Sequence, residues 1–393
     1  MEYRVSVDDF NKIVSREHTA SLKYDGCRDI FGRSDLLPLW VADMDFCTPE
    51  FVFNAIERKI KDRILGYYIH PEILYQSIIG WMMRRHQWSI EKDWIYFSDG
   101  VMPSIFLLIQ VFTSPGDKVL VQTPVYSPFY SAIENQGRIV IKNPLLVDKD
   151  HYVIDFQNLE ICLKQGVRAM ILCNPHNPVG RCWSMEELKT IGELCLKYNC
   201  LVIADEVHSD VVMPGYKHIP ISSASEQIAL NSIVCMSPSK AFNVAGLSTS
   251  IVIIQNAILR ERYEKFRQGI HLSQGNIFGE VALESCYSRG EEWLSTMLRY
   301  IKGNVDYVQE FIAGNISGIR TFRHDATYLL WLDFSSLDLS HEEISRLLIE
   351  KAGLALCDGT AYGEEGKMHF RMNVACQKAR LEMAMEKMKV TFG

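Results

Sequence analysis

The chain has 393 residues, of which 48% are hydrophobic and 23% charged, the composition of an ordinary soluble globular protein with more than one domain. Its formal net charge of −7 is not gathered into runs of one sign, which argues against nucleic acid or an anionic membrane as a partner.

The N-terminal sequence MEYRVSVDDFNKIV has no apolar stretch of the kind found in signal peptides. The longest uncharged run, 241–259, is too polar for a membrane span, so we expect a cytoplasmic protein. The eleven cysteines include no C-x-x-C pair and are expected to be reduced, mostly buried thiols.

Short apolar runs alternate with helix-like stretches, such as 184–198, between about residues 95 and 255. Continuous apolar strands separated by helices are typical of a mostly parallel sheet with helices on both faces. We therefore expect an α/β fold with a seven-stranded sheet. Its predicted strands are 95–97, 119–122, 139–142, 169–173, 201–204, 233–236 and 250–254.

After about Gly290 the sequence changes to long charged helices, with one strand pair indicated by ATYLLWLDF (326–334) and MHFRMNVAC (368–376). This part is expected to form a smaller α+β domain together with the N-terminal segment. The expected boundaries are 48–287 for the large domain and 1–47 with 288–393 for the small one.

Polar residues follow five of the predicted strands, at what should be one edge of the sheet, where ligands of such folds bind. A lysine there, Lys240, can form a Schiff base with a carbonyl group, and the neighbouring Asp205 can hold a protonated ring nitrogen. The segment SDGVMPS (98–104) can open a helix whose free amides bind a phosphate. Together these features describe a pyridoxal phosphate site.

Each feature alone has an ordinary explanation. Lys240 can be a solvated surface lysine, Asp205 a helix cap, and Tyr126 a core aromatic, while NPHNPVG (174–180) can be only a turn. Their occurrence in order on successive strand ends favours a common site. The sequence has no dinucleotide-binding glycine motif, P-loop, zinc-protease helix or hydrolase nucleophile elbow, and no metal site is expected.

These motifs, with SLKYD (21–25), PLWVADMDF (38–46), LGYY (65–68) and SPSKAFNVAGLS (237–248), extend over nearly the whole chain. The sequence resembles fold type I pyridoxal phosphate enzymes of the class I/II aminotransferase superfamily. Within this superfamily it is most similar to the cystathionine β-lyase and cystalysin branch of C–S lyases, for which WVADMDF is typical.

The resemblance implies that Lys240 carries pyridoxal 5′-phosphate as a Schiff base and later moves the α-proton of the substrate, while Asp205 pairs with the pyridine nitrogen. It places Tyr126 on the ring, Asn177 and His208 near the phenolic oxygen, and the backbone of Val101 and Met102 with the hydroxyls of Ser237 and Ser239 around the phosphate.

For the substrate, the resemblance implies that Arg371 binds the α-carboxylate and that the Val41–Ala42 backbone closes over it. Tyr67 would reach the phosphate of a neighbouring subunit, which implies a homodimer with shared active sites. The alternative is that Tyr67 is only an interface or core aromatic.

The expected reaction is the α,β-elimination of a sulfur amino acid, cystathionine or cysteine, to pyruvate, ammonia and a thiol. Many aminotransferases have a basic residue eight positions after the lysine, where this chain has Ser248, which favours a lyase. The alternatives are an aminotransferase that uses the same site and a lyase with an added regulatory interaction role.

Overall fold

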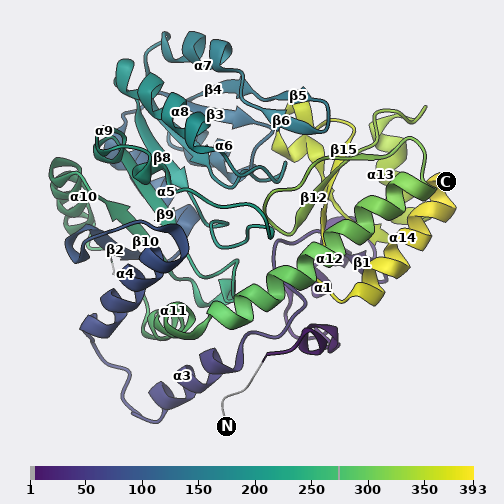
Figure 1. The fold of residues 1–393 in the computed structure, drawn as a ribbon, viewed down its shortest axis with the longest axis horizontal. Coiled ribbons are helices and arrows are strands. Elements are labelled where there is room, and N and C mark those ends of the chain that lie inside the picture. Colours follow the sequence, from purple (N-terminus) through teal and green to yellow (C-terminus); the bar gives the residue numbers. More distant parts are fainter. Residues whose placement is uncertain (1–4, 273–274) are drawn as a thin grey trace.

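The computed structural model describes residues 5–272 and 275–393, so residues 1–4 of the expected small domain lie outside the described part. A seven-stranded sheet forms the centre of the larger part of the molecule, at the left of Figure 1. Its strands, in spatial order, are β2 (Ile95–Ser98), β10 (Ser250–Ile254), β9 (Ser232–Met236), β8 (Leu201–Asp205), β7 (Val167–Cys173), β3 (Lys118–Thr123) and β4 (Ile139–Pro144). All seven predicted strands are confirmed.

Only β10 runs against its neighbours in this sheet, because it pairs antiparallel with both β2 and β9. The other six strands share one direction, so their carboxyl ends meet at one edge of the sheet. The five segments with polar residues therefore follow strands that end on the same side.

Helices cover both faces of the sheet, since successive residues of each strand point to opposite sides. In β8, Val202 and Ala204 belong to the hydrophobic core that also contains residues of α8, whereas Ile203 belongs to the core that contains α5. The helices of this part are α3 (Glu50–Ile60), α4 (Glu72–His86), α5 (Val101–Phe112), α6 (Pro128–Glu134), α7 (Phe156–Leu163), α8 (Met185–Lys197), α9 (Glu226–Leu230), α10 (Ala257–Gly269) and α11 (Ile277–Arg289).

Helix α8 shows why the predicted segment 184–198 becomes helical. Ser184 caps its first turn by accepting a hydrogen bond from the Glu187 amide, and the Glu187 carboxylate accepts one from the Ser184 amide in return. Leu188, Ile191 and Cys195 fall on one side of the helix and are buried against the sheet.

A second, four-stranded sheet lies at the right of Figure 1, and the long helix α12 (Glu291–Asn315) extends to it from the larger part. Its strands, in spatial order, are β11 (Arg320–Thr321), β12 (Leu329–Asp333), β15 (His369–Asn373) and β14 (Cys357–Asp358), with helices α13 (His341–Glu350) and α14 (Lys378–Phe392). The predicted strand pair is the antiparallel pair of β12 and β15.

The N-terminal segment packs with this C-terminal part, because β1 (Leu37–Pro38) pairs in parallel with β13 (Leu354–Ala355). The short helices α1 (Leu22–Asp25) and α2 (Cys27–Phe31) precede β1, and the hairpin of β5 (Leu146–Asp148) and β6 (His151–Val153) follows β4. The expected domain boundaries at 48 and 287 stay a prediction.

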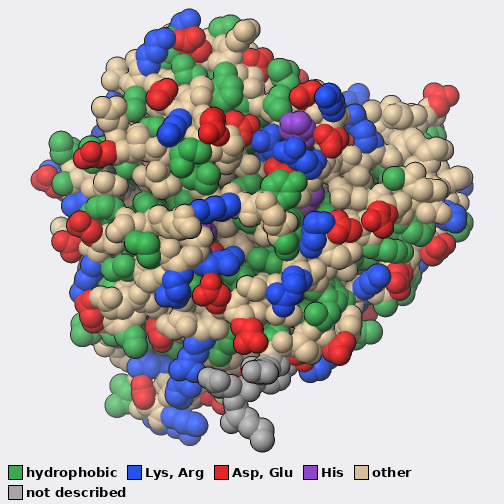
Figure 2. Space-filling model, in the orientation of Figure 1, with side chains coloured by type: hydrophobic (Ala, Val, Ile, Leu, Met, Phe, Trp, Pro, Cys, Tyr) green, Lys and Arg blue, Asp and Glu red, His purple; other side chains and the backbone are tan. Residues whose placement is uncertain are grey.

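Basic and acidic side chains are interspersed over the face drawn in Figure 2. Within residues 5–272 and 275–393, no helix is long and apolar enough to cross a membrane. The eleven cysteines all lie in this described part, where each is a free thiol; nine are buried, Cys47 is exposed and Cys357 is half-buried.

Candidate active site

Lys240 lies just beyond the end of β9, in the turn Ser237–Lys240. Its Nζ donates a hydrogen bond to the backbone carbonyl of Ala42 at 2.8 Å. The hydroxyl of the buried Tyr328 donates to the same oxygen at 3.0 Å. One carbonyl of the N-terminal segment therefore fixes both side chains, although they are far apart in the sequence.

The surroundings of Lys240 make its ammonium group unusually acidic. Burial and the nearby Arg371 guanidinium lower the pKa of Lys240 to about 8, against the opposing attraction of Asp43 and Asp205. A lysine with such a pKa is more readily neutral near neutral pH, and the neutral amine is the form that can act as nucleophile or base.

Asp205 and His208 lie close to Lys240, and burial shifts the pKa of each of them. Asp205 ends β8, and its Oδ1 accepts a hydrogen bond from the Val207 amide at 3.0 Å. Burial raises the pKa of Asp205 to about 6, while Lys240 counteracts this rise. Burial also lowers the pKa of His208, whose Nδ1 is buried without a hydrogen-bond partner. A positively charged ring nitrogen beside Asp205 would stabilise its ionised form.

Arg371 on β15 joins the small sheet to the same site. Its Nη1 donates to Asn177 Oδ1 at 3.2 Å and its Nη2 donates to the Trp40 carbonyl at 2.9 Å, while Nε is buried without a partner. Arg371 also affects the pKa of Tyr126, which burial raises and the guanidinium lowers. Tyr126 is half-buried and packs edge to face on Phe129, with 5.9 Å between ring centroids.

A network of polar contacts holds the Val41–Ala42 segment over this site. Asn373 Nδ2 donates to the carbonyls of Val41 and Asp43 at 2.5 and 2.6 Å. The fully buried Lys23 lies 3.1 Å from Asp45 Oδ2 and 3.7 Å from Asp43 Oδ1. These contacts join residues before and after Ala42 to the body of the protein, so the acceptor of the Lys240 hydrogen bond is held in place.

The N-terminus of α5 forms another wall of the strand-end edge. Gly100 precedes the helix with φ +143°, a conformation that side-chain-bearing residues rarely adopt, and no side chain caps the helix. The amides of the first turn, including those of Val101 and Met102, have no acceptor within the helix. Such an end is suited to a phosphate group.

The hydroxyl groups of the two predicted serines, Ser237 and Ser239, differ in whether their hydrogen is available to a phosphate. Ser237 Oγ donates to the Thr249 carbonyl at 2.7 Å and accepts from the Ser239 amide at 3.1 Å. Its hydrogen is thus already engaged, whereas Ser239 is half-buried at the same turn. Ser248 is exposed, with φ +44°.

Tyr67 is a predicted site residue that lines a cavity with none of the other predicted site residues. It is fully exposed, in the segment between α3 and α4, and it lines a cavity of about 560 Å³ with Tyr68, Ile73, Ile277 and Val281. The structure therefore brings together the strand-end residues, Arg371 and the Val41–Ala42 segment within one chain, but not Tyr67.

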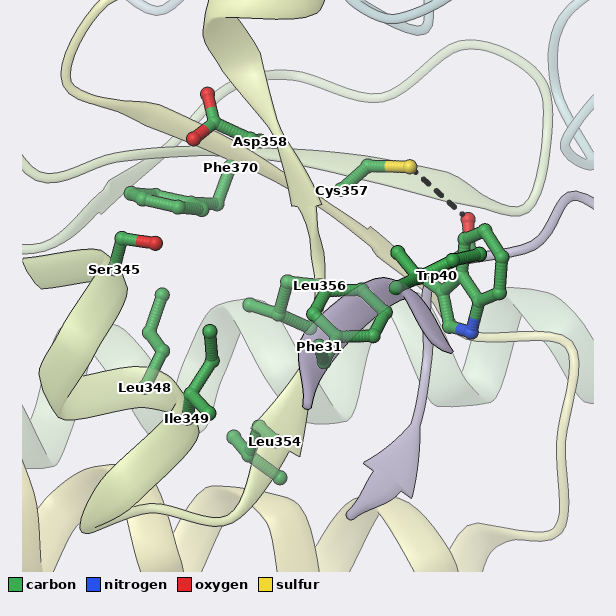
Figure 3. Close-up of a pocket in the computed structure, with 11 residues that line it drawn as sticks. Phe31, Trp40, Ser345, Leu348, Ile349, Leu354, Leu356, Cys357, Asp358 and Phe370 are labelled. Atoms are coloured by element: carbon green, nitrogen blue, oxygen red, sulfur yellow. Dashed lines mark hydrogen bonds between the residues drawn. The ribbon is translucent and has the colours of Figure 1, made fainter. Parts of the chain in front are cut away.

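Sequence reasoning did not single out Tyr328, Trp40 or Cys357, although the first two stand in motifs that carried the resemblance. Cys357 Sγ donates to the Trp40 carbonyl at 3.3 Å and accepts from Arg371 Nη2 at 3.4 Å. Figure 3 shows Cys357 and Trp40 at one side of a largely apolar cavity of about 340 Å³. Trp40 and Cys357, which contact Arg371, therefore also line this cavity between α13 and β13.

The residues present fit pyridoxal phosphate. The His208 Nδ1 without a partner can meet a ring substituent, the Asp205 carboxylate forms no ion pair within 4 Å among the described residues, and the uncapped end of α5 offers amides to a phosphate. The Lys240 amine lies close enough to Asp205 and Arg371 for their charges to interact. The individual contacts to the cofactor stay predictions.

Comparison with known proteins agrees with this arrangement. Residues 35–388 match the family of class I and II aminotransferases. Cystathionine β-lyase PatB of Bacillus subtilis (strain 168) is 40% identical over 385 residues, covering 98% of this chain and 100% of the relative. The cystalysin structure from Treponema denticola, which contains pyridoxal 5′-phosphate, has a TM-score of 0.93 and 36% identity, covering 98% of each chain. A pyridoxal phosphate-bound C–S lyase from Staphylococcus hominis has a TM-score of 0.90 and 31% identity, covering 98% of this chain and 97% of that one.

Proposed function

The chain belongs to the class I and II aminotransferase family, and from this premise we infer that it is a pyridoxal phosphate-dependent C–S lyase. The observation that carries this conclusion is the 40% identity to a cystathionine β-lyase over 98% of the chain. The substrate is a small sulfur-containing amino acid, cystathionine or cysteine, which is cleaved to a thiol, pyruvate and ammonia.

Bound pyridoxal phosphate supplies an electron sink that stabilises negative charge on the α-carbon of the substrate. The side chains of the protein then have to move the α-proton of the substrate and bind two charged groups, the substrate carboxylate and the ring nitrogen. Lys240, with its lowered pKa, is the base that takes the α-proton when its amine is neutral. Loss of that proton allows the bond between the β-carbon and sulfur to break, and sulfur leaves as a thiolate.

Arg371 binds the carboxylate of the substrate. In the structure its Nη1 and Nη2 donate to Asn177 and to the Trp40 carbonyl, which keeps the guanidinium plane in a fixed orientation. A carboxylate that binds there forms charge-assisted hydrogen bonds with a preorganised fork. Asp205 would hold the protonated ring nitrogen of the cofactor, a cationic partner that would favour its ionised form.

We also propose that the enzyme is a cytoplasmic homodimer and that Tyr67 of one subunit reaches the phosphate of the other. The full exposure of Tyr67, next to the exposed Ile64 and Ile69, supports this arrangement.

The test is to incubate the purified holoenzyme with cystathionine in the absence of any keto acid. We expect pyruvate to form over many turnovers per active site. If product formation stops at about one equivalent and resumes when a keto acid is added, the protein is an aminotransferase and the proposal is wrong. The control is the same assay with alanine, which has no sulfur leaving group.

A further inference from the structure

A cavity of about 390 Å³ that no strand-end site residue lines is found between the end of α4, the loop 209–218 and α12. Its polar lining consists of Arg85, His86, Ser209, Tyr216, Lys217, His218, Ser295 and Arg299. Among the described residues that line it, three are arginine or lysine and none is aspartate or glutamate. The volume is within the range of sites for small molecules.

Among the residues that the structure describes, no group accepts a hydrogen bond from Nδ1 of the buried His218. Its Nε2 lies 2.8 Å from Oε2 of the buried Glu206, whose Oε1 accepts from the Ile221 amide at 2.9 Å. Burial raises the pKa of Glu206 to about 8 and lowers that of His218, so near neutral pH the carboxyl group keeps its proton and the imidazole is neutral. Glu206 then donates to Nε2, which leaves the ring hydrogen on Nδ1. Nδ1 is buried and has no partner.

Two further nitrogen atoms beside it are also unsatisfied. His86, whose ring lies 5.2 Å from that of His218, has its Nε2 3.3 Å from Asp210 Oδ1 and its Nδ1 without a partner. Arg85 Nε is buried without a hydrogen bond, 3.8 Å from the same carboxylate oxygen. Buried polar atoms without partners are rare in folded proteins, and here Arg85 Nε and His218 Nδ1 are the ones that carry a hydrogen.

Two acidic groups lie beside these side chains, Glu206 against His218 and Asp210 against Arg85 and His86. Asp210 is buried, and its two oxygens already accept hydrogen bonds from Trp81 Nε1 at 3.2 and 3.0 Å. Lys217 donates to Gln87 Oε1 and Arg299 to Thr296 Oγ1, both neutral acceptors, so neither cation is paired with an acid in these contacts. Asp210 offsets the charge of Arg85, so the excess positive charge at the cavity is that of Lys217 and Arg299.

We propose that this cavity binds a small oxyanion with two or more negative charges, of the class of diphosphates and phosphate esters. Arg85, Lys217 and Arg299 supply charged donors at its walls, and the hydroxyls of Ser209 and Ser295 with the Nδ1 hydrogen of His218 supply further directional donors. Oxyanions accept several hydrogen bonds at once and form the strongest of them with charged donors.

The test is isothermal titration calorimetry of the holoenzyme with pyrophosphate as the probe, at constant ionic strength in a phosphate-free buffer. We expect saturable binding of one pyrophosphate per subunit. The double variant R85Q/R299Q should weaken it at least about tenfold, since it removes two charged hydrogen-bond donors. The matched control is R168Q/R346Q, which removes two exposed arginines outside the cavity and should leave the affinity unchanged.

Where the double variant does not fold, the exposed single replacements K217Q and R299Q give the same test with a smaller loss, and the absorption band of the bound cofactor reports whether the fold is intact. Absence of saturable binding at millimolar pyrophosphate would overturn the proposal. Equal affinity of wild type and R85Q/R299Q would also overturn it, because the anion would then bind adventitiously elsewhere. Both outcomes are independent of whether the enzyme proves to be a lyase.

Discussion

The strand-end site and the segment 61–71 differ greatly in how far their side chains are buried. In the site, Asp205 is 5% and Arg371 3% exposed, and polar contacts from three parts of the sequence hold them. In the segment, Ile64, Tyr67 and Ile69 are 78%, 111% and 85% exposed. A cluster of large apolar side chains in water indicates a surface that another protein covers.

The segment is nevertheless anchored at its end. The Tyr68 hydroxyl donates to Glu280 Oε1 at 2.9 Å, and His70 Nδ1 lies 2.9 Å from Glu280 Oε2. These contacts hold Tyr68 and His70, on either side of Ile69, against α11, whereas Tyr67 is exposed. The proposed function gives the two regions different parts, with the buried set acting within its own chain and the exposed Tyr67 acting in the site of the other subunit. The following predictions test each half of this comparison.

The largest effect is expected for Lys240→Ala in the buried set. Because this variant loses the base that moves the α-proton, kcat for pyruvate formation should fall by about 10²–10⁴-fold or more. Lys164→Ala, which removes an exposed lysine, should keep wild-type kcat. Steady-state assays of both variants give the comparison, and a fully active Lys240→Ala protein would remove Lys240 from the mechanism.

Asp205 should make the cofactor-free protein less stable as pH rises. Its pKa is raised from 3.8 to about 6 in the folded state, so the folded chain binds the proton more tightly than the unfolded chain. Stability is therefore lost between pH 3.8 and 6, and the full cost of about 3 kcal/mol is present above pH 6. Asp205→Asn should recover up to that amount at pH 7 and nothing below pH 4.

Denaturant unfolding of the two cofactor-free proteins at several pH values measures this gain. The exposed Glu261→Gln serves as control and should change stability by no more than about 0.5 kcal/mol at any pH. A gain for Asp205→Asn that is the same at pH 4 and pH 7 would show that the carboxylate is not the cause.

A smaller effect is expected for Arg371→Ala, which removes a charged hydrogen-bond partner of the substrate. The value of kcat/KM should fall at least about tenfold, with the cofactor absorption band nearly unchanged. Arg320→Ala, which removes an arginine paired with Asp333 on the same sheet, should leave kcat/KM near wild type. Equal losses from both replacements would mean that the effect is structural.

Mixing two inactive variants tests the exposed half of the comparison. In a hybrid of Lys240→Ala with a crippling Tyr67 variant, one site collects both defects and the other neither. Random reassociation makes about half of the dimers hybrid, so up to roughly a quarter of wild-type activity should return. Native mass spectrometry confirms that subunits exchange. Exchange without recovered activity would show that Tyr67 does not act in the partner's site.

The sequence was sufficient for features that repeat locally. The seven strands of the large sheet are continuous apolar runs, and the polar residues that follow them mark the edge where Lys240 and Asp205 meet. The two-residue strands β1, β13, β11 and β14 are too short to produce a periodic pattern, so they could not be predicted.

The contacts that complete the site were also beyond prediction, because they join residues distant in the chain. The hydrogen bonds of Lys240 and Tyr328 to the Ala42 carbonyl bridge 198 and 286 positions. Cys357 reaches Arg371 only because β14 and β15 pair with these two residues opposite each other. Such partners depend on which distant segments the fold places side by side, which no local pattern records.

The most direct measurement of the central claim is to locate the lysine that carries the cofactor. The holoenzyme is reduced with borohydride, digested, and its peptides are mapped by mass spectrometry. We expect the pyridoxyl group on Lys240, in the peptide that contains SPSKAFN, and on no other lysine in stoichiometric amount. A pyridoxyl group on another residue, such as the buried Lys23, with Lys240 unmodified would contradict the account.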